Sequence, residues 1–187
     1  MNRLPILLAG LTIAIAAVLA GLYASAPGKD GSAGKRTEIP ADAASAVFAS
    51  TLVDSDGRPQ ALAQWRGKTL VINFWAAWCP PCRDEMPGFA RLQEKYGADG
   101  VQFVGIALDS ADNVRHFVAQ TPVNYPLLLG NEAGHESASE LARAIGNRTL
   151  ALPYTLIIDA GGRARFARLG YVAEEELENH IKQLLNR

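Results

Sequence analysis

Residues 74–83 read Phe74-Trp75-Ala76-Ala77-Trp78-Cys79-Pro80-Pro81-Cys82-Arg83 and hold the only two cysteines of the chain. An apolar run precedes them, and a segment with helical spacing of apolar residues follows. A cysteine at a helix start meets unpaired N–H groups and the positive end of the helix dipole, which both favour the thiolate. Thiolates attack disulfides, and a second cysteine three residues on can reach the first. The pattern predicts a pair that cycles between dithiol and disulfide.

Other uses of the cysteine pair fit the sequence less well. A structural zinc site needs about four ligands, but there is no second cysteine pair, and the histidines are scattered at positions 116, 135 and 180. Covalent haem attachment needs a histidine directly after the second cysteine, where Arg83 stands. A purely structural disulfide would close only a tiny loop, which gains little entropy. We therefore favour redox chemistry, with no metal and no cofactor beyond the cysteine pair.

The composition indicates a globular domain with an N-terminal appendage. The chain has 187 residues, a formal net charge of −1 and 49% hydrophobic residues. Without a basic excess, nucleic acid is not an expected partner.

The N-terminus is apolar and uncharged from Leu4 to Ala26. This length suffices to span a bilayer, which takes about 20 residues. We expect residues 1–26 to form a signal anchor, although Ala24-Ser25-Ala26 also fits the cleavage site of a signal peptide. Residues 27–45, rich in Gly, Ser, Pro and charges, are expected to be a flexible linker, and residues 46–187 to be the folded domain.

Strands and helices alternate in the expected domain. Strands are expected over 47–53, 69–75, 101–108, 126–129, 154–159 and 163–169, with a short strand or helical turn over 60–65. Helices are expected over 81–96, 111–120, 136–145 and 174–185. This order predicts an α/β fold with a mixed sheet, helices on both faces, and the buried strands 69–75 and 101–108 parallel and central. Their ends place Trp78, Cys79 and Asp109 at one edge, where open α/β sheets usually carry their sites.

These residues resemble the thioredoxin superfamily, and specifically its exported, often membrane-tethered TlpA-like branch. The matching stretches are Val71-Ile72-Asn73-Phe74-Trp75-Ala76-Ala77-Trp78-Cys79-Pro80-Pro81-Cys82-Arg83-Asp84-Glu85-Met86-Pro87 and Leu152-Pro153-Tyr154-Thr155-Leu156-Ile157-Ile158-Asp159. The resemblance spans about residues 46–187. It implies a thioredoxin-like α/β fold and thiol–disulfide oxidoreductase activity, in a branch that includes the reductases of cytochrome c maturation.

The resemblance also implies roles for individual residues. Cys79 would be the exposed nucleophile, and Cys82 would resolve the mixed disulfide. Pro153 would follow a cis peptide bond and face the cysteines, leaving the backbone groups of Leu152 to pair with a substrate chain. We expect Trp78 to line the substrate surface.

Glu85 is the candidate acid–base group. Many cytoplasmic thioredoxins carry a buried aspartate six positions before the first cysteine, where this chain has Asn73, which cannot take a proton. Glu85 follows Cys82 by three residues and shares its helix face, and the TlpA-like resemblance includes an acid there. In apolar surroundings its pKa would rise, and it could accept the proton of Cys82. The alternative is a first-turn glutamate that only complements the helix dipole.

Pro80 and Pro81 bear on the direction of electron flow. Neither has an N–H, so two potential donors to the Cys79 thiolate are missing. A less stabilised thiolate disfavours the dithiol and makes the couple more reducing.

The favoured function is reduction of disulfides in exported proteins, with a membrane thiol donor that resets the pair. The domain is expected on the periplasmic side of the bacterial inner membrane, anchored by residues 4–26, or soluble in the periplasm after cleavage near Ala26. The flanking charges do not support this orientation, because Arg3 precedes the segment while Lys29, Lys35 and Arg36 follow it.

Several alternatives stay open. Members dedicated to cytochrome c maturation often show Gly-Val-x-Gly-x-Pro-Glu before the later strand, which residues 147–154 do not match. The same cysteines could serve a disulfide oxidase or isomerase. A peroxiredoxin-type peroxidase normally needs a threonine where this chain has Ala76. A tethered binding module without redox chemistry is the non-enzymatic alternative.

Overall fold

Two buried parallel strands form the centre of the sheet. The computed structural model describes residues 35–130 and 138–186. β4 (Thr69–Trp75) is buried at every position, and β5 (Val101–Ala107) at all but its second. They pair in parallel from Thr69 opposite Val101 to Trp75 opposite Ala107. Strands that are buried on both faces need a layer of structure packed against each face. The burial and the parallel pairing confirm the two central strands that the sequence predicts.

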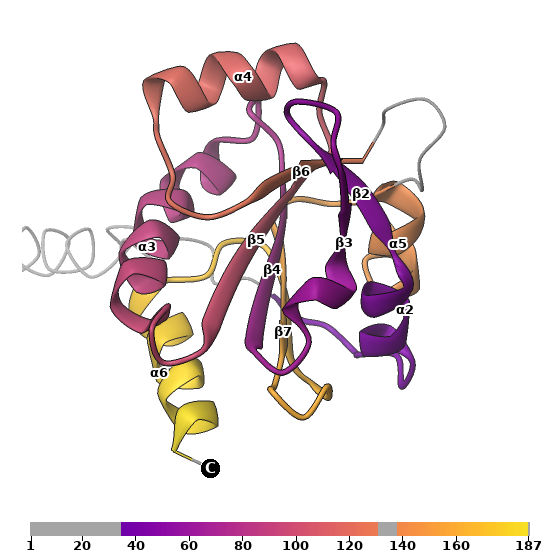
Figure 1. The fold of residues 1–187 in the computed structure, drawn as a ribbon, viewed down its shortest axis with the longest axis vertical. Coiled ribbons are helices and arrows are strands. Elements are labelled where there is room, and N and C mark those ends of the chain that lie inside the picture. The colour runs from indigo at the N-terminus through magenta and orange to yellow at the C-terminus, as the bar shows by residue number, and fades with distance from the viewer. Residues whose placement is uncertain (1–34, 131–137, 187) are drawn as a thin grey trace, which may run out of the picture. The chain divides into compact units, whose positions relative to one another are not determined.

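The other strands of the described residues extend this pair into a mixed sheet (Figure 1), which has eight strands in this part of the chain. The order across the sheet is β1-β8-β7-β4-β5-β6-β2-β3. β6 pairs parallel with β5, while β7 pairs antiparallel with β4. The bounds are β1 (Lys35–Arg36), β2 (Thr51–Asp54), β3 (Pro59–Ala61), β6 (Leu127–Leu129), β7 (Tyr154–Ile158) and β8 (Ala164–Leu169).

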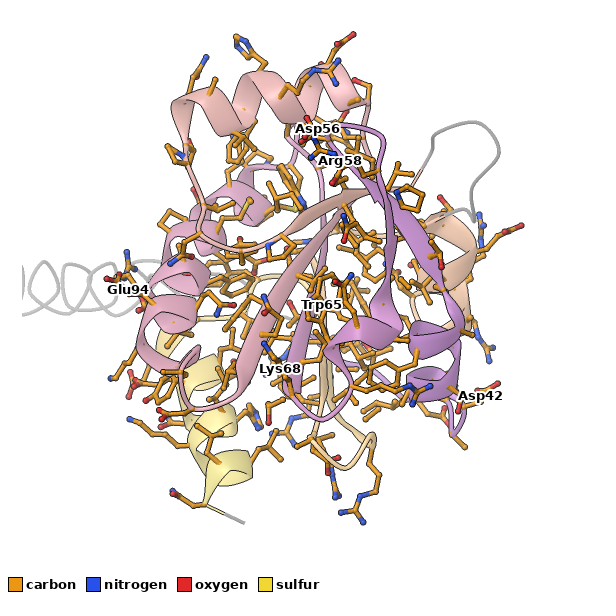
Figure 2. All side chains as sticks on the ribbon, in the orientation of Figure 1. Asp42, Asp56, Arg58, Trp65, Lys68 and Glu94 are labelled. Carbon is orange, nitrogen blue, oxygen red and sulfur yellow. A yellow bond between two sulfur atoms is a disulfide. The ribbon has the colours of Figure 1, made fainter. Side chains whose placement is uncertain are left out.

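Helices cover both faces, as predicted (Figure 1). The side chains of α3 (Pro80–Tyr96), α4 (Ala111–Gln120) and α6 (Glu174–Leu185) share one buried cluster. Those of α2 (Ala43–Ala49), α5 (Ala138–Ala144) and the 3-10 turn η1 (Leu62–Trp65) share the other, which includes Trp65 (Figure 2). Because side chains alternate along a strand, Ile72 and Phe74 join the second cluster while Val71 and Trp75 join the first. Asn73 therefore faces the layer that contains α3.

The start of the domain differs from expectation. The strand expected over 47–53 is wrong for its first half, because α2 continues to Ala49 and β2 starts at Thr51. Within the expected linker, β1 pairs with β8, and Thr37 N–H donates to the carbonyl of Ala167. The fold therefore begins upstream of residue 46.

Two expectations fall on residues that the structure does not describe. The expected anchor over 1–26 and the linker up to residue 34 lie outside the described residues, as does the beginning of the helix expected over 136–145. Among the helices of residues 35–130 and 138–186, none has the length and apolar character needed to cross a membrane.

Candidate active site

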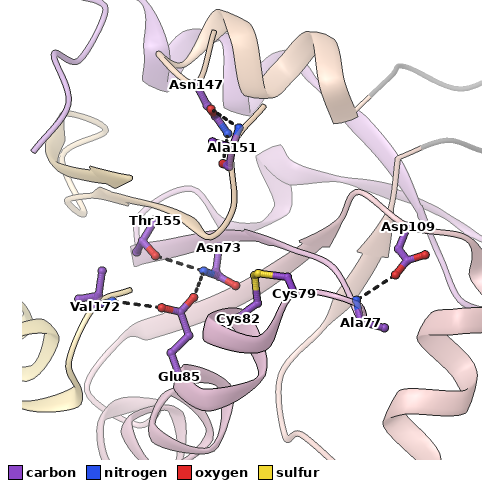
Figure 3. The surroundings of a disulfide bond; sticks show 10 residues. All are labelled: Asn73, Ala77, Cys79, Cys82, Glu85, Asp109, Asn147, Ala151, Thr155 and Val172. Carbon is purple, nitrogen blue, oxygen red and sulfur yellow. Dashed lines mark hydrogen bonds between the residues drawn. A yellow bond between two sulfur atoms is a disulfide. The ribbon is translucent and has the colours of Figure 1, made fainter. Parts of the chain in front are cut away.

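The two cysteines form a disulfide at the start of α3 (Figure 3). Cys79 is the N-cap, and Pro80 and Pro81 occupy the first helical positions, where a missing N–H breaks no helical hydrogen bond. The Cα atoms of Cys79 and Cys82 lie 5.3 Å apart. The predicted helix start and the ability of the pair to close are both confirmed.

The disulfide is more enclosed than expected. Cys79 is 3% exposed and Cys82 is fully buried, so the expectation of an exposed nucleophile is wrong for this oxidised form. The reason is that both residues pack into the buried cluster between α3 and the sheet. Trp78, directly before Cys79, is 66% exposed, in contrast to the buried Trp75.

Glu85 is buried one turn after Cys82 in α3 and is 3% exposed. Its Oε1 accepts a hydrogen bond from Asn73 Nδ2 at 2.7 Å, and its Oε2 accepts one from the backbone N–H of Val172 at 3.2 Å. Asn73 Nδ2 also donates to Thr155 Oγ1 at 3.2 Å. Figure 3 shows these four residues as a connected polar group beside the disulfide.

The surroundings of Glu85 favour its protonated form near neutral pH. Burial raises the pKa of Glu85 to about 8, against the two hydrogen bonds from Val172 and Asn73, which lower it. The first turn of α3 contains no acidic residue, so the alternative of a first-turn glutamate that complements the helix dipole is wrong. A buried carboxyl with this pKa can take up and release a proton next to a thiol.

Pro153 follows a cis peptide bond, as the resemblance implied. Its carbonyl accepts a hydrogen bond from Gly170 N–H at 2.8 Å. β7 begins at Tyr154 opposite Phe74, so Pro153 lies at the end of the sheet from which the chain leads to Cys79.

Asp109 holds the loop before the disulfide. Its Oδ2 accepts a hydrogen bond from Ala77 N–H at 2.9 Å (Figure 3). Its Oδ1 accepts hydrogen bonds from Ser110 N–H and from Asn113 Nδ2. The sequence placed Asp109 at the same edge as Cys79, and the structure confirms this. The sequence did not indicate that the Asp109 carboxylate accepts a hydrogen bond from the backbone N–H of Ala77.

Two further members of the site were missed from the sequence. Val172 contributes only a backbone N–H, which no residue pattern signals. Thr155 lies in a matching stretch, but its contact with Asn73 joins residues 82 positions apart. In the described part of the chain, no group of three or more His, Cys, Asp or Glu side chains could hold a metal ion.

Comparison with known proteins identifies the fold family. The family model described as Redoxin matches residues 35–185. The chain belongs to the redoxin family. Thiol-disulfide oxidoreductase ResA of Bacillus anthracis is 30% identical over 135 residues, which cover 71% of this redoxin and 73% of that protein.

Solved structures agree with this assignment. A thioredoxin-related protein from Neisseria meningitidis serogroup B is 32% identical, with a TM-score of 0.63, covering 73% of this chain and 99% of the other. A thiol:disulfide interchange protein of the thioredoxin family from Chlorobium tepidum is 28% identical, with a TM-score of 0.62, covering 81% and 97%. This redoxin is a TlpA-like member of the thioredoxin superfamily and a thiol–disulfide oxidoreductase. Enzymes of this kind use a cysteine redox centre rather than a bound cofactor.

Proposed function

We propose that this redoxin reduces disulfides of exported proteins through a dithiol/disulfide cycle of Cys79 and Cys82. One observation carries the proposal: the Cys79–Cys82 disulfide lies at the N-terminus of α3, with the protonatable Glu85 buried one turn further on.

The first step uses the reduced protein. The Cys79 thiolate, stabilised at the N-cap of α3, attacks one sulfur of a substrate disulfide. The substrate S–S bond breaks, a Cys79–substrate disulfide forms, and the other substrate sulfur leaves as a thiolate that takes a proton from water.

The second step releases the substrate. In the minority of molecules in which Glu85 is ionised near neutral pH, Cys82 gives its proton to this carboxylate, and the Cys82 thiolate attacks Cys79 Sγ. The Cys79–Cys82 disulfide forms, and the second substrate sulfur leaves and is protonated. The substrate has gained two electrons and two protons, and Glu85 then returns its proton to solvent. Because the pKa of Glu85 is about 8 and that of a free thiol is about 8.5, this proton transfer is close to balanced.

The absence of N–H groups at Pro80 and Pro81 supports the reducing direction. A membrane dithiol would restore the reduced pair by the reverse exchange.

The apolar segment over residues 4–26 supports a location on the periplasmic side of the inner membrane, with the domain either anchored there or released by cleavage near Ala26. Cytochrome c maturation is the candidate pathway from the TlpA-like resemblance.

Trapping tests the proposal. Cys82→Ser removes the resolving thiol, so the mixed disulfide on Cys79 should accumulate and identify the substrate by mass spectrometry. Cys79→Ser, the matched control, should trap nothing. If the reduced, folded wild-type protein leaves insulin and other disulfide-bonded proteins unreduced, the proposed function is wrong.

A further inference from the structure

Asn147 is buried although it lies in the loop between α5 and β7, and it is only 2% exposed. Its side chain bonds both backbone polar groups of one residue, Ala151 (Figure 3). Nδ2 donates to the Ala151 carbonyl at 2.9 Å, and Oδ1 accepts from the Ala151 N–H at 3.2 Å. A side-chain amide offers one donor and one acceptor side by side, so Asn147 pairs with Ala151 as a neighbouring β-strand would.

The backbone of Asn147 is fixed as well. Its N–H donates to the carbonyl of Ala142 in α5 at 2.8 Å, and its carbonyl accepts from Leu150 N–H at 3.2 Å. Leu150 closes this turn in the left-handed region, with φ of 55°. The side chain of Asn147 thus projects from a turn fastened to the end of α5 and holds Ala151 in place.

The residue after Ala151 has unused hydrogen-bonding capacity. In the described part of the chain, the N–H and carbonyl of Leu152 have no hydrogen-bond partner, and Leu152 is half-buried. Its side chain packs against the buried cluster that contains Cys79 and Cys82. An extended polypeptide that reaches the disulfide would therefore meet a free donor and a free acceptor at Leu152.

We propose that Asn147 is a positioning residue for protein substrates, which holds Leu152 as a docking edge for their extended backbone. This inference rests on the proposed reductase function and on the pairing of Leu152 with a substrate chain that the TlpA-like resemblance implies. It adds the residue that holds this edge in place. Among the described residues, the side chain of Asn147 hydrogen-bonds Ala151 alone, so its effect on the cysteines is indirect. Small disulfides without peptide groups would not use the Leu152 edge.

The experiment compares Asn147→Ala with the wild-type full chain on two substrates. Ala151 is exposed, so water can replace its lost partners and the fold should persist. For insulin, we expect KM to rise about five- to tenfold with kcat nearly unchanged, which corresponds to the loss of roughly one hydrogen bond. For an aromatic disulfide such as dithiobis(nitrobenzoic acid), we expect the rate to stay the same, and the reduction potential of the pair should also stay the same.

Two other variants complete the design. Asn179→Ala removes an exposed asparagine of α6 and should match the wild type on both substrates. Asn147→Asp keeps the acceptor for Ala151 N–H but loses the donor, and it replaces Asn147→Ala if that variant does not fold. Equal losses on insulin and the aromatic disulfide, or no loss on either in a folded variant, would overturn the inference. A wild-type protein that reduces neither substrate would instead refute the proposed function.

Discussion

Asn73 Nδ2 lies 2.7 Å from Glu85 Oε1, and both side chains are buried. Asn73 occupies the position in β4 where many cytoplasmic thioredoxins carry an aspartate. Here the β4 residue cannot ionise and donates hydrogen bonds to Glu85 and Thr155, and the ionisable carboxyl comes from α3. The proton-accepting group proposed for Cys82 therefore lies on the same helix as the cysteines, where the helix fixes its spacing from Cys82.

Replacing Glu85 with glutamine should slow resolution of the mixed disulfide. Glutamine keeps the size of the side chain but cannot take the proton of Cys82. We expect release of the second substrate thiol to slow by roughly 100-fold in a single turnover, since general base catalysis typically contributes at least that much. Glu94→Gln, at an exposed position of the same helix, is the control and should leave the rate unchanged. Equal rates for Glu85→Gln and wild type would remove Glu85 from the mechanism.

Stability of the oxidised protein should depend on pH through Glu85. Its pKa is raised to about 8 by burial, so the folded state holds this proton more tightly than the unfolded state does. The stabilisation is complete below the ordinary glutamate pKa and is lost as pH rises through the folded pKa. The free energy of unfolding should therefore fall between about pH 4.5 and 8, by at most about 1.4 kcal/mol per pH unit from this group.

Urea unfolding at several pH values checks this dependence. The Glu85→Gln variant has no titrating group at this position, so the curve of its unfolding free energy against pH should be flatter than that of the wild type. Parallel curves for the two proteins would show that Glu85 does not titrate as proposed.

Restoring an N–H between the cysteines should make the couple less reducing. Pro81→Ala supplies a donor near the Cys79 thiolate, and a hydrogen bond to a charged group contributes about 1.5–3 kcal/mol. The reduction potential should rise by about 30–60 mV, measured by equilibration with a dithiol of known potential. Pro59→Ala, at an exposed strand position, should leave it unchanged. A lower potential for Pro81→Ala would contradict the argument.

Much of the fold follows from local patterns. β4 is an apolar run apart from Thr69 and Asn73, and the bounds expected for α4 and α6 are those observed. In α2, the buried residues Ala43, Ala44, Val47 and Phe48 have helical spacing, but the alternation of apolar residues from residue 47 onward also fits a strand. β1 consists of two charged residues, so no apolar pattern could predict it.

The candidate site was predictable only in part. The cysteine motif placed the disulfide, and helical spacing placed Glu85 beside it. The partners of Glu85 could not be derived, because Val172 is 87 residues away and contributes only its backbone. Asn147 appeared in the sequence only as a departure from a family pattern, since its role depends on a turn geometry that residue types alone do not specify.

Asp109→Ala should loosen the loop that precedes the disulfide. The substitution removes the acceptor for Ala77 N–H and two bonds at the start of α4. We expect a loss of about 1–3 kcal/mol in unfolding free energy and faster hydrogen exchange at the Ala77 amide. Asp112→Ala, on the same helix, removes only an exposed ion pair with Arg115 and should cost less than about 1 kcal/mol. Unchanged exchange at Ala77 would show that Asp109 does not hold this loop.

The outermost described strands of the sheet are short, two residues in β1 and three in β3. β1 carries the charged Lys35 and Arg36, and β3 starts at Pro59, which has no N–H to offer a neighbouring chain. Such edges resist indiscriminate strand addition. A thiol–disulfide oxidoreductase with such edges is less prone to co-aggregate with the polypeptides that it contacts.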